Sequence, residues 1–307
     1  MSTAQATSPP PGSLARHAFR AMGTEVLVLL DAPDDGATQD ALRRAEADVR
    51  RIEGLASRFD PASELSALNA AGEGEVSTDL LRLITLALEM RDTTGGRFDP
   101  TVHEAVVSAG YDRSLDQLPL DAGQPGPAMP GGGGVHIDLR TGRVTMAEGT
   151  CLDLGGIAKG WTADRIADEL GVHGPCMVSL GGDIAVRGLL HGEPWPVEVL
   201  HADAARTVGL RRGGMATSGT DRRRWRRGGM PMHHVIDPHT GRPSETDLTR
   251  VTVVANDAAA AEAWATALLV SGSERASRDA VTRGLAAVLV GIDGNVITTG
   301  SLADGQA

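Results

Sequence analysis

The chain has 307 residues, and 41% of them are hydrophobic, which is enough for one large domain or two small ones with a real core. Its 29 basic and 40 acidic residues give a net charge of −11, which argues against general nucleic-acid binding. Aromatic residues make up only 3% of the sequence, so platforms for base stacking are not expected either.

Three features bear on where the protein resides. The two cysteines, Cys151 and Cys176, form neither a CxxC pair nor a zinc-binding spacing, which fits a reducing compartment. Residues 1–16 are rich in Ser, Ala and Pro and predict a disordered tail. No signal peptide, lipidation cysteine or transmembrane run is visible, so we expect a cytoplasmic protein without membrane insertion.

The first half of the chain alternates strand and helix signals. A strand is expected from Phe19 to Leu30, and a helix follows with apolar residues at helical spacing between 42 and 55. A short helical turn is expected over 63–69. A second helix is expected over 80–90, with Ser77 or Thr78 as its cap. The Pro/Gly-rich stretch 124–134 predicts a flexible surface loop.

Strands dominate the second half. They are expected at 135–139, 143–146, 175–180, 184–188, 195–200, 250–255, 285–291 and 295–298. An alanine-rich helix is expected at 258–271. Strands outnumber helices and connect locally. This favours a single α+β domain over 17–302, with mixed or antiparallel sheets flanked by helices, rather than a doubly wound parallel sheet.

A glycine-rich turn links strand and helix signals at 152–161 (LDLGGIAKGW). Such a turn directs backbone N–H groups and the positive end of a helix dipole toward whatever lies above it. Asp153 and Lys159 add one charge of each sign, which suits a phosphate accompanied by a metal ion. The alternative is a turn without a ligand.

Glu262 and Thr266 are four residues apart on the expected helix and therefore project from one face. A carboxylate and a hydroxyl are hard oxygen donors, which suits Mg²⁺. The pairing is also commonplace on helix surfaces, so the alternative is two residues without a ligand.

The segment 234–241 (HVIDPHTG) is expected to be a short strand that runs into a turn. His234 at its start has the chemistry of a general base, with a capping or solvated histidine as the alternative. A zinc cluster with His233 and His239 is not expected, because the spacing matches no zinc motif and thiolate partners are missing.

Two further polar segments have side chains that could bind a ligand. Thr217 and Ser218 stand beside a glycine and suit phosphate or ribityl oxygens, with a polar turn as the alternative. The stretch 222–227 (RRRWRR) is the one basic run in an acidic chain. It indicates either a solvated loop or contact with an acidic ligand or partner.

Eight short motifs follow one another along the chain: Met22-Gly23-Thr24, 63–69 (SELSALN), 94–102 (TGGRFDPTV), 153–160 (DLGGIAKG), Gly181-Gly182-Asp183, Thr217-Ser218-Gly219, 234–241 and 262–267 (EAWATA). In order and residue type this set resembles the ApbE family of FAD:protein FMN transferases, over roughly residues 17 to 300. Each motif alone is ambiguous, but eight in order are specific. The family usually has Asp where this chain has Glu262.

The resemblance implies an enzyme that binds FAD as its substrate and needs Mg²⁺. By matching position, the FAD site would be lined by Met22, Phe59, Arg97, Phe98, Asp99, Asp153, Lys159 and Ile236, with Thr217 and Ser218 beside them. The metal would be held by the backbone carbonyls around Gly156 and Ala158 together with Glu262 and Thr266. His234 matches the family histidine assigned as base.

The implied reaction transfers FMN from FAD to a Ser or Thr hydroxyl of an acceptor protein and releases AMP. His234 would take the hydroxyl proton. Lys159 and the N–H groups of 155–157 would support developing charge. Two alternatives stay open: an FAD pyrophosphatase that yields FMN and AMP, and a non-catalytic flavin-binding protein. The expected partners are FAD and an acceptor protein with a flavinylation motif, without nucleic acid.

Overall fold

The computed structural model describes residues 14–119, 121, 123–201 and 204–302. Its centre is one sheet of eight strands in which every neighbouring pair is antiparallel. In spatial order the strands are β1 (Leu14–Ala21), β2 (Thr24–Asp31), β6 (Cys176–Leu180), β7 (Asp183–Arg187), β10 (Gly213–Gly219), β15 (Leu248–Ala255), β16 (Ala286–Gly291) and β17 (Val296–Thr299). The predicted α+β class with antiparallel strands is therefore confirmed.

Four smaller sheets surround the central one. They are β3–β5–β4 (Glu73–Glu75, Arg143–Met146 and Val135–Asp138), β8–β9 (Trp195–His201 and Ala204–Leu210), β11–β12 (Arg224–Arg227 and Met230–His233) and β13–β14 (Ile236–Asp237 and Arg242–Pro243).

The helices of the described chain are α1 (Gly36–Ala56), α2 (Glu64–Ala71), α3 (Thr78–Thr93), α4 (His103–Ser108), α5 (Ala158–Leu170), α6 (Ala258–Ser271) and α7 (Ser273–Thr282), with 3₁₀ turns η1 (Leu115–Gln117) and η2 (Gly300–Leu302). Ser77 caps α3 as expected, and Asp257 caps α6. In the described part of the chain, no helix has both the length and the apolar character needed to cross a membrane.

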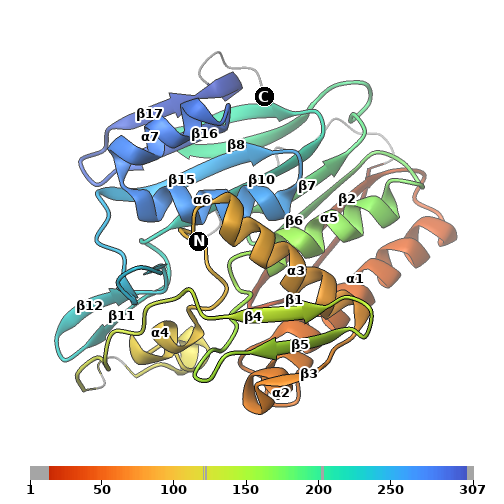
Figure 1. The fold of residues 1–307 in the computed structure, drawn as a ribbon. Coiled ribbons are helices and arrows are strands. Elements are labelled where there is room, and N and C mark those ends of the chain that lie inside the picture. Colours follow the sequence, from red (N-terminus) through yellow and green to blue (C-terminus); the bar gives the residue numbers. More distant parts are fainter. Residues whose placement is uncertain (1–13, 120, 122, 202–203, 303–307) are drawn as a thin grey trace.

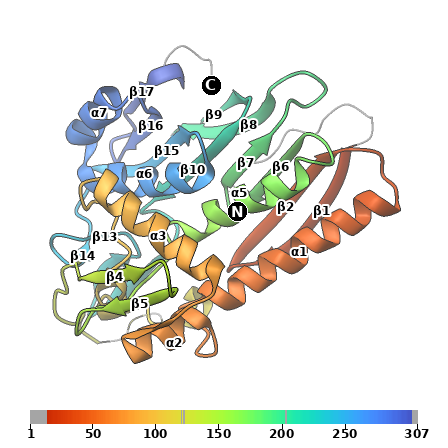
Figure 2. The same cartoon turned by 45° about the vertical axis from the view of Figure 1, so that its right-hand side comes forward.

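Both faces of the central sheet are covered, because alternate side chains of its strands enter different cores. On β2, Val28 and Leu30 pack with α1 and α5, whereas Leu29 packs with the β8–β9 hairpin around Trp195. Figure 1 shows α5 and α6 crossing one face of the sheet, and Figure 2 shows α1 running beside β1 and β2. The sheet is thus buried on both faces, with helices on one face and the β8–β9 hairpin on the other.

The expected single strand over 19–30 is wrong, because the chain makes a tight hairpin there. β1 and β2 are joined by Met22 and Gly23, which have φ angles of 52° and 68°. Two consecutive residues with positive φ match the twist of a two-residue hairpin. The Met22 N–H is fixed by a 2.6 Å hydrogen bond to Glu53 Oε1 on α1. The first strand begins at Leu14, so the predicted tail overlaps it, and residues 1–13 lie outside the described residues.

Other differences lie in polar segments. Thr217 and Ser218 belong to the central strand β10 rather than to a turn. The basic run forms β11 and the residues before it. The loop 124–134 has no helix or strand, but its backbone is anchored: Gly131 N–H donates to the Pro238 carbonyl and Gly132 N–H to Asp99 Oδ2, both at 2.7 Å. Its predicted flexibility stays a prediction.

Helices α5 and α6 approach each other closely where the predicted site residues lie. A Cβ atom on Gly160 would lie 2.4 Å from the Ala258 carbonyl oxygen, so only glycine fits at this crossing. Next to it, both carboxylate oxygens of Asp164 on α5 accept 3.0 Å hydrogen bonds from the first N–H groups of α6, at Ala258 and Ala259. Asp164 therefore holds the start of α6 against α5.

Candidate active site

The centre of the site is a lysine held between two carboxylates. Lys159, in the first turn of α5, pairs with Asp183 Oδ2 of β7 at 2.8 Å and with Glu262 Oε1 of α6. The other Glu262 oxygen accepts a 2.9 Å hydrogen bond from the Gly160 N–H. Asp183 and Glu262 are 4% and 3% exposed, so the cluster is nearly shielded from water.

Charge in this cluster is set by burial and mutual contact. Burial disfavours the Lys159 ammonium, but Asp183 and Glu262 outweigh it and raise the pKa of Lys159 to about 12. Burial and the neighbouring Asp183 carboxylate raise the pKa of Glu262 to about 7, against the opposing effect of Lys159. The lysine is therefore a fixed cation, and its ammonium contacts both carboxylates at once.

Two of the four predicted metal ligands, Glu262 and Thr266, lie on α6. Thr266 lies one helical turn beyond Glu262 on α6, and its Oγ1 is 2.9 Å from Ser218 Oγ of β10. Carboxylate and hydroxyl oxygens are the donors that Mg²⁺ prefers, so the residues fit such an ion. The Ala158 carbonyl, also predicted as a ligand, accepts a 2.6 Å hydrogen bond from Thr162 Oγ1. Thr217 Oγ1 is instead 2.9 Å from Thr252 Oγ1, within the sheet.

The glycine-rich turn is closed more tightly than the sequence suggests. Gly155 N–H donates to Asp153 Oδ1 at 2.8 Å, and Ile157 N–H donates to the Leu154 carbonyl at 3.1 Å. Two of the three N–H groups expected to support charge are therefore already occupied by the turn itself. That expectation is wrong for Gly155 and Ile157, and Lys159 supplies the positive charge of this turn.

His234 lies at a bend directly after β12, not within a strand. Its Nδ1 is buried and has no hydrogen-bond partner among the described residues. Burial and the positive charges of Arg223, His233 and Lys159 hold the pKa of His234 well below its usual range. The ring is therefore neutral near pH 7 and can accept a proton. The Nδ1 of His233 is likewise buried without a partner among the described residues, but its Nε2 is 3.1 Å from the Ser244 carbonyl.

Three charged residues of the site had no role assigned from the sequence. Asp183 was noted only as part of a Gly-Gly-Asp motif. The basic run 222–227 had two open interpretations, a solvated loop or a contact with an acidic ligand or partner. Arg223 lies close enough to lower the pKa values of both Lys159 and His234. Burial and the nearby Arg250 lower the pKa of Arg222, and Asp221 and Asp183 oppose this shift. Within the described residues, neither arginine has an ion pair within 4 Å. They are cations available to an anionic ligand.

A second group of predicted residues surrounds Arg58, which sequence reasoning missed. The Arg58 guanidinium is 3.0 Å from Asp153 Oδ2 and lies 4.0 Å from the centre of the Phe59 ring. It also lies 4.6 Å from the ring of Tyr111, which stacks on Trp225. Phe59 is 39% exposed, so it presents an aromatic surface to solvent. A planar heterocycle can stack on such a surface.

The motif 94–102 contributes one residue that touches the turn and two that do not. Phe98 is buried, and its ring lies 3.1 Å from where a Cβ on Gly156 would stand. Asp99 binds Thr101 and the Gly132 N–H, so its carboxylate holds the loop 124–134 in place. Arg97 Nε donates to Ser271 Oγ at 3.0 Å, at the end of α6.

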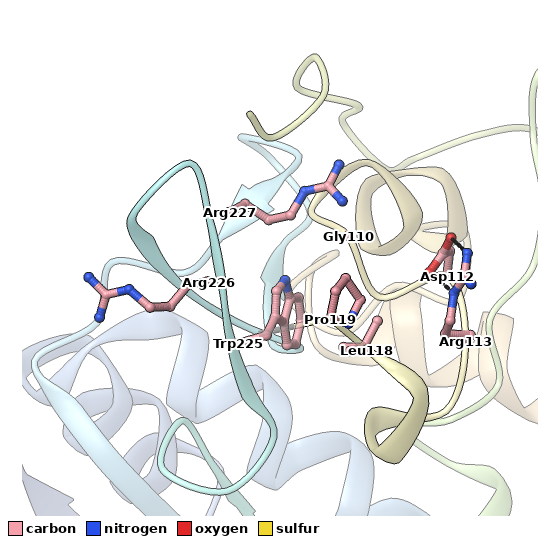
Figure 3. A pocket seen from close by; sticks show the side chains of 8 residues that line it. All are labelled: Gly110, Asp112, Arg113, Leu118, Pro119, Trp225, Arg226 and Arg227. Carbon is pink, nitrogen blue, oxygen red and sulfur yellow. Dashed lines mark hydrogen bonds and ion pairs between the residues drawn. The ribbon is translucent and has the colours of Figure 1, made fainter. Parts of the chain in front are cut away.

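A small pocket lies between β11 and the segment 110–119 (Figure 3). It has a volume of about 130 Å³, and its lining includes Trp225, Leu118 and Pro119, with Arg226 and Arg227 at the hairpin. None of the predicted site residues lines it. The predicted FAD residue Ile236 is buried in the adjoining apolar cluster, where it packs with Trp225 and Met232.

The chain belongs to the ApbE family, whose sequence model matches residues 22–289. An FAD:protein FMN transferase from Treponema pallidum is 35% identical over 249 residues, which cover 72% of this chain and 67% of the relative. One from Klebsiella pneumoniae is 28% identical over 299 residues, which cover 91% of this chain and 85% of the relative. The resemblance drawn from the eight motifs is confirmed, as is the expectation of an enzyme.

Solved structures agree with this assignment. The ApbE protein of Thermotoga maritima is 26% identical and superposes with a TM-score of 0.85, covering 96% of this chain and 99% of that structure. The flavin transferase ApbE of Vibrio cholerae, at 23% identity, shares the fold with a TM-score of 0.79, covering 96% of this chain and all of that one.

Proposed function

We propose that this chain transfers the FMN moiety of FAD to a Ser or Thr hydroxyl of an acceptor protein and releases AMP. The observation that carries the proposal is the convergence of a buried Lys159–Glu262–Asp183 cluster with the unpaired Arg222 and Arg223. The diphosphate of FAD is anionic and would be neutralised by these cations. The names of the curated relatives support the same reaction.

The residues present can perform such a transfer. The acceptor oxygen forms a bond to the FMN-side phosphorus while the bond from that phosphorus to the oxygen of AMP breaks. His234, neutral near pH 7, takes the proton of the hydroxyl. Lys159 and the two arginines stabilise charge on the phosphate oxygens and on the departing AMP.

The proposal includes a Mg²⁺ ion bound next to the Lys159 cluster. Glu262 and Thr266 would hold Mg²⁺ with the backbone carbonyls of Gly156 and Ala158. When bound, Mg²⁺ would supply Lewis-acid stabilisation of the diphosphate. Glu262 would then bind the Mg²⁺ while Lys159 binds the phosphate, and the two side chains would stay in contact, as they are in this structure.

The flavin half of the substrate would lie toward Phe59 and Phe98. Phe59 offers an exposed ring beside the Arg58–Asp153 pair, and Phe98 adjoins the turn at Gly156. The chain should therefore bind FAD more tightly than FMN, because FAD reaches both this region and the Lys159 cluster. Calorimetric titration with each flavin tests this, and equal or reversed affinities would contradict FAD as substrate.

The decisive experiment incubates the purified chain with FAD, Mg²⁺ and a purified acceptor domain, followed by intact-mass measurement. Transfer predicts that the acceptor gains one FMN phosphoester. An acceptor with its Ser or Thr changed to Ala should gain none. A pyrophosphatase would give free FMN and AMP without an adduct, and a binding protein would leave FAD intact. The cytoplasmic location and the Ser/Thr flavinylation motif of the acceptor stay predictions.

A further inference from the structure

A second cluster of metal-binding side chains lies outside the Lys159 cluster. His103 and Glu104 stand in the first turn of α4, and Cys151 lies on the segment that leads to the glycine-rich turn. One ligand atom from each of the three residues lies within 4.8 Å of the other two. Among the described residues, no other group of three His, Cys, Asp or Glu side chains meets in this way.

The two segments that carry these ligands are fixed relative to each other. The Asn69 side chain bonds both backbone groups of Leu152, at 2.8 and 2.9 Å, which holds the residue next to Cys151. Asp153 N–H donates to the Pro100 carbonyl at 2.7 Å, and Asp99 bonds Thr101 just before α4. The ligands are therefore presented by a supported backbone, which reduces the ordering cost of binding.

The contacts within the cluster keep its donor atoms close together. His103 Nδ1 is 3.0 Å from Glu104 Oε1, and Cys151 Sγ, which donates to the Asn69 carbonyl at 3.9 Å, lies within 4.8 Å of the ligand atoms of both residues. In a tetrahedral site with metal–ligand bonds of about 2.0–2.3 Å, ligand atoms stand roughly 3.3–3.8 Å apart. Small side-chain adjustments would bring the three atoms to those distances.

From this juxtaposition we infer that His103, Glu104 and Cys151 form a binding site for Zn²⁺, with a fourth position open to water. Imidazole, carboxylate and thiolate together are a zinc donor set, and thiolate disfavours Mg²⁺. The sulfur forms a bond to the metal while the thiol proton is released to solvent. All three side chains are partly exposed, so the ion has a path from solvent. Bound zinc would tie the start of α4 to the segment entering the Asp153 turn.

Co²⁺ serves as a spectroscopic probe, because only a thiolate ligand gives a sulfur-to-cobalt charge-transfer band. Titration of the full metal-free chain should produce such a band that saturates at one equivalent and is abolished by Zn²⁺ but not by excess Mg²⁺. Cys151→Ser should remove the band. Cys176→Ser is the matched control and should keep it, because the buried Cys176 lies on β6. Glu262→Gln should also keep it, which separates this site from the proposed Mg²⁺ site.

Zinc affinity measured by competition with a chromophoric chelator tests the other two ligands. His103→Ala and Glu104→Gln should each raise the Kd by more than about 100-fold, since even outer-shell partners of a metal are worth 10–100-fold. Circular dichroism of each variant checks its folding, and these two variants decide the matter if Cys151→Ser does not fold. Absence of the band, or a band that persists in Cys151→Ser, would overturn the inference.

Discussion

The backbone N–H of Gly160 donates a 2.9 Å hydrogen bond to Glu262 Oε2, although the two residues are 102 positions apart. The preceding residue, Lys159, binds the other oxygen of the same carboxylate. One turn of α5 therefore supplies both a neutral and a charged donor to one acidic group on α6. This arrangement holds Glu262 in a single orientation.

Gly160→Ala should destabilise the protein and weaken flavin transfer. The new Cβ would lie 2.4 Å from the Ala258 carbonyl oxygen, a backbone atom that cannot turn aside. We expect a loss of about 1–3 kcal/mol in the free energy of unfolding, the usual cost of overpacking. Gly54→Ala, in α1 with open space around it, is the control and should raise stability by about 0.5–1 kcal/mol. Urea titrations measure both, and similar effects would contradict the close crossing.

Two substitutions of Glu262 should separate the effect of its side-chain charge on activity from the effect of its side-chain length. Glu262→Gln removes the charge and leaves a poorer Mg²⁺ ligand, so most of the transfer activity should be lost and partly recovered at high Mg²⁺. Glu262→Asp keeps the carboxylate that is more usual in the family and should retain much of the activity. Transfer rates over a Mg²⁺ titration provide the measurement. A Gln variant with unchanged Mg²⁺ dependence would remove Glu262 from the metal site.

The two adjacent histidines should behave differently. His234→Ala should lower transfer by about 10²–10⁴, the range of general acid–base catalysis, while leaving FAD binding largely intact. His233→Ala should affect the rate much less. His233 is the last residue of β12, and its ring contacts the Ser244 carbonyl. If the two variants exchange these effects, His233 is the base.

The pH dependence of the rate offers an independent test of His234. Its depressed pKa keeps the ring neutral down to well below pH 6.5, so the acid limb of the kcat/KM profile should lie below that value. Because burial raises the pKa of Glu262 to about 7, this carboxylate adds its own limb near that pH; an acid limb at 6.5 or above that persists in Glu262→Gln at high Mg²⁺ would contradict a buried base surrounded by cations.

Asp164→Asn should change how stability depends on pH. Burial raises the pKa of Asp164 to about 6, above the usual aspartate value of 3.8. Between these values the folded state binds the proton more strongly, so Asp164 makes stability fall as pH rises from about 4 to 6. At about 1.4 kcal/mol for each unit, the stability of the native protein relative to Asp164→Asn should decline by on the order of 3 kcal/mol. Unfolding curves at pH 4, 5 and 6 measure this, and parallel profiles would contradict it.

Much of the fold could be predicted because its signals are local. The helix 258–271 has the bounds expected, since Asp257 caps an alanine-rich segment whose first turn is then satisfied. Segments with few apolar residues were missed. On β11 only Trp225 is buried, so alternation could not identify the strand. The turn at Met22 and Gly23 was missed because Met rarely adopts a positive φ.

The site was only partly predictable, for a different reason. Motifs predicted Glu262, Thr266, Lys159 and His234 as site residues, and this stays a prediction. The distances between them depend on how α5, α6 and the β11–β12 hairpin pack. The sequence contains no measure of the Lys159–Asp183 separation, so Asp183 received no role. Arg58 was missed because its partners, Asp153 and Tyr111, lie far along the chain and come together only through the fold.

Lys159 and Glu262 are 103 residues apart in the sequence, and this distance affects how the chain folds during its synthesis. During synthesis α5 leaves the ribosome about a hundred residues before the carboxylate that accepts its lysine. A buried ammonium with an incomplete set of partners is costly, so α5 cannot settle firmly on the sheet until α6 has emerged. The central sheet has the same requirement, because β10 pairs with β15 beyond residue 247. Nascent chains that end before α6 should therefore be substrates for chaperones and proteases rather than partly active enzymes.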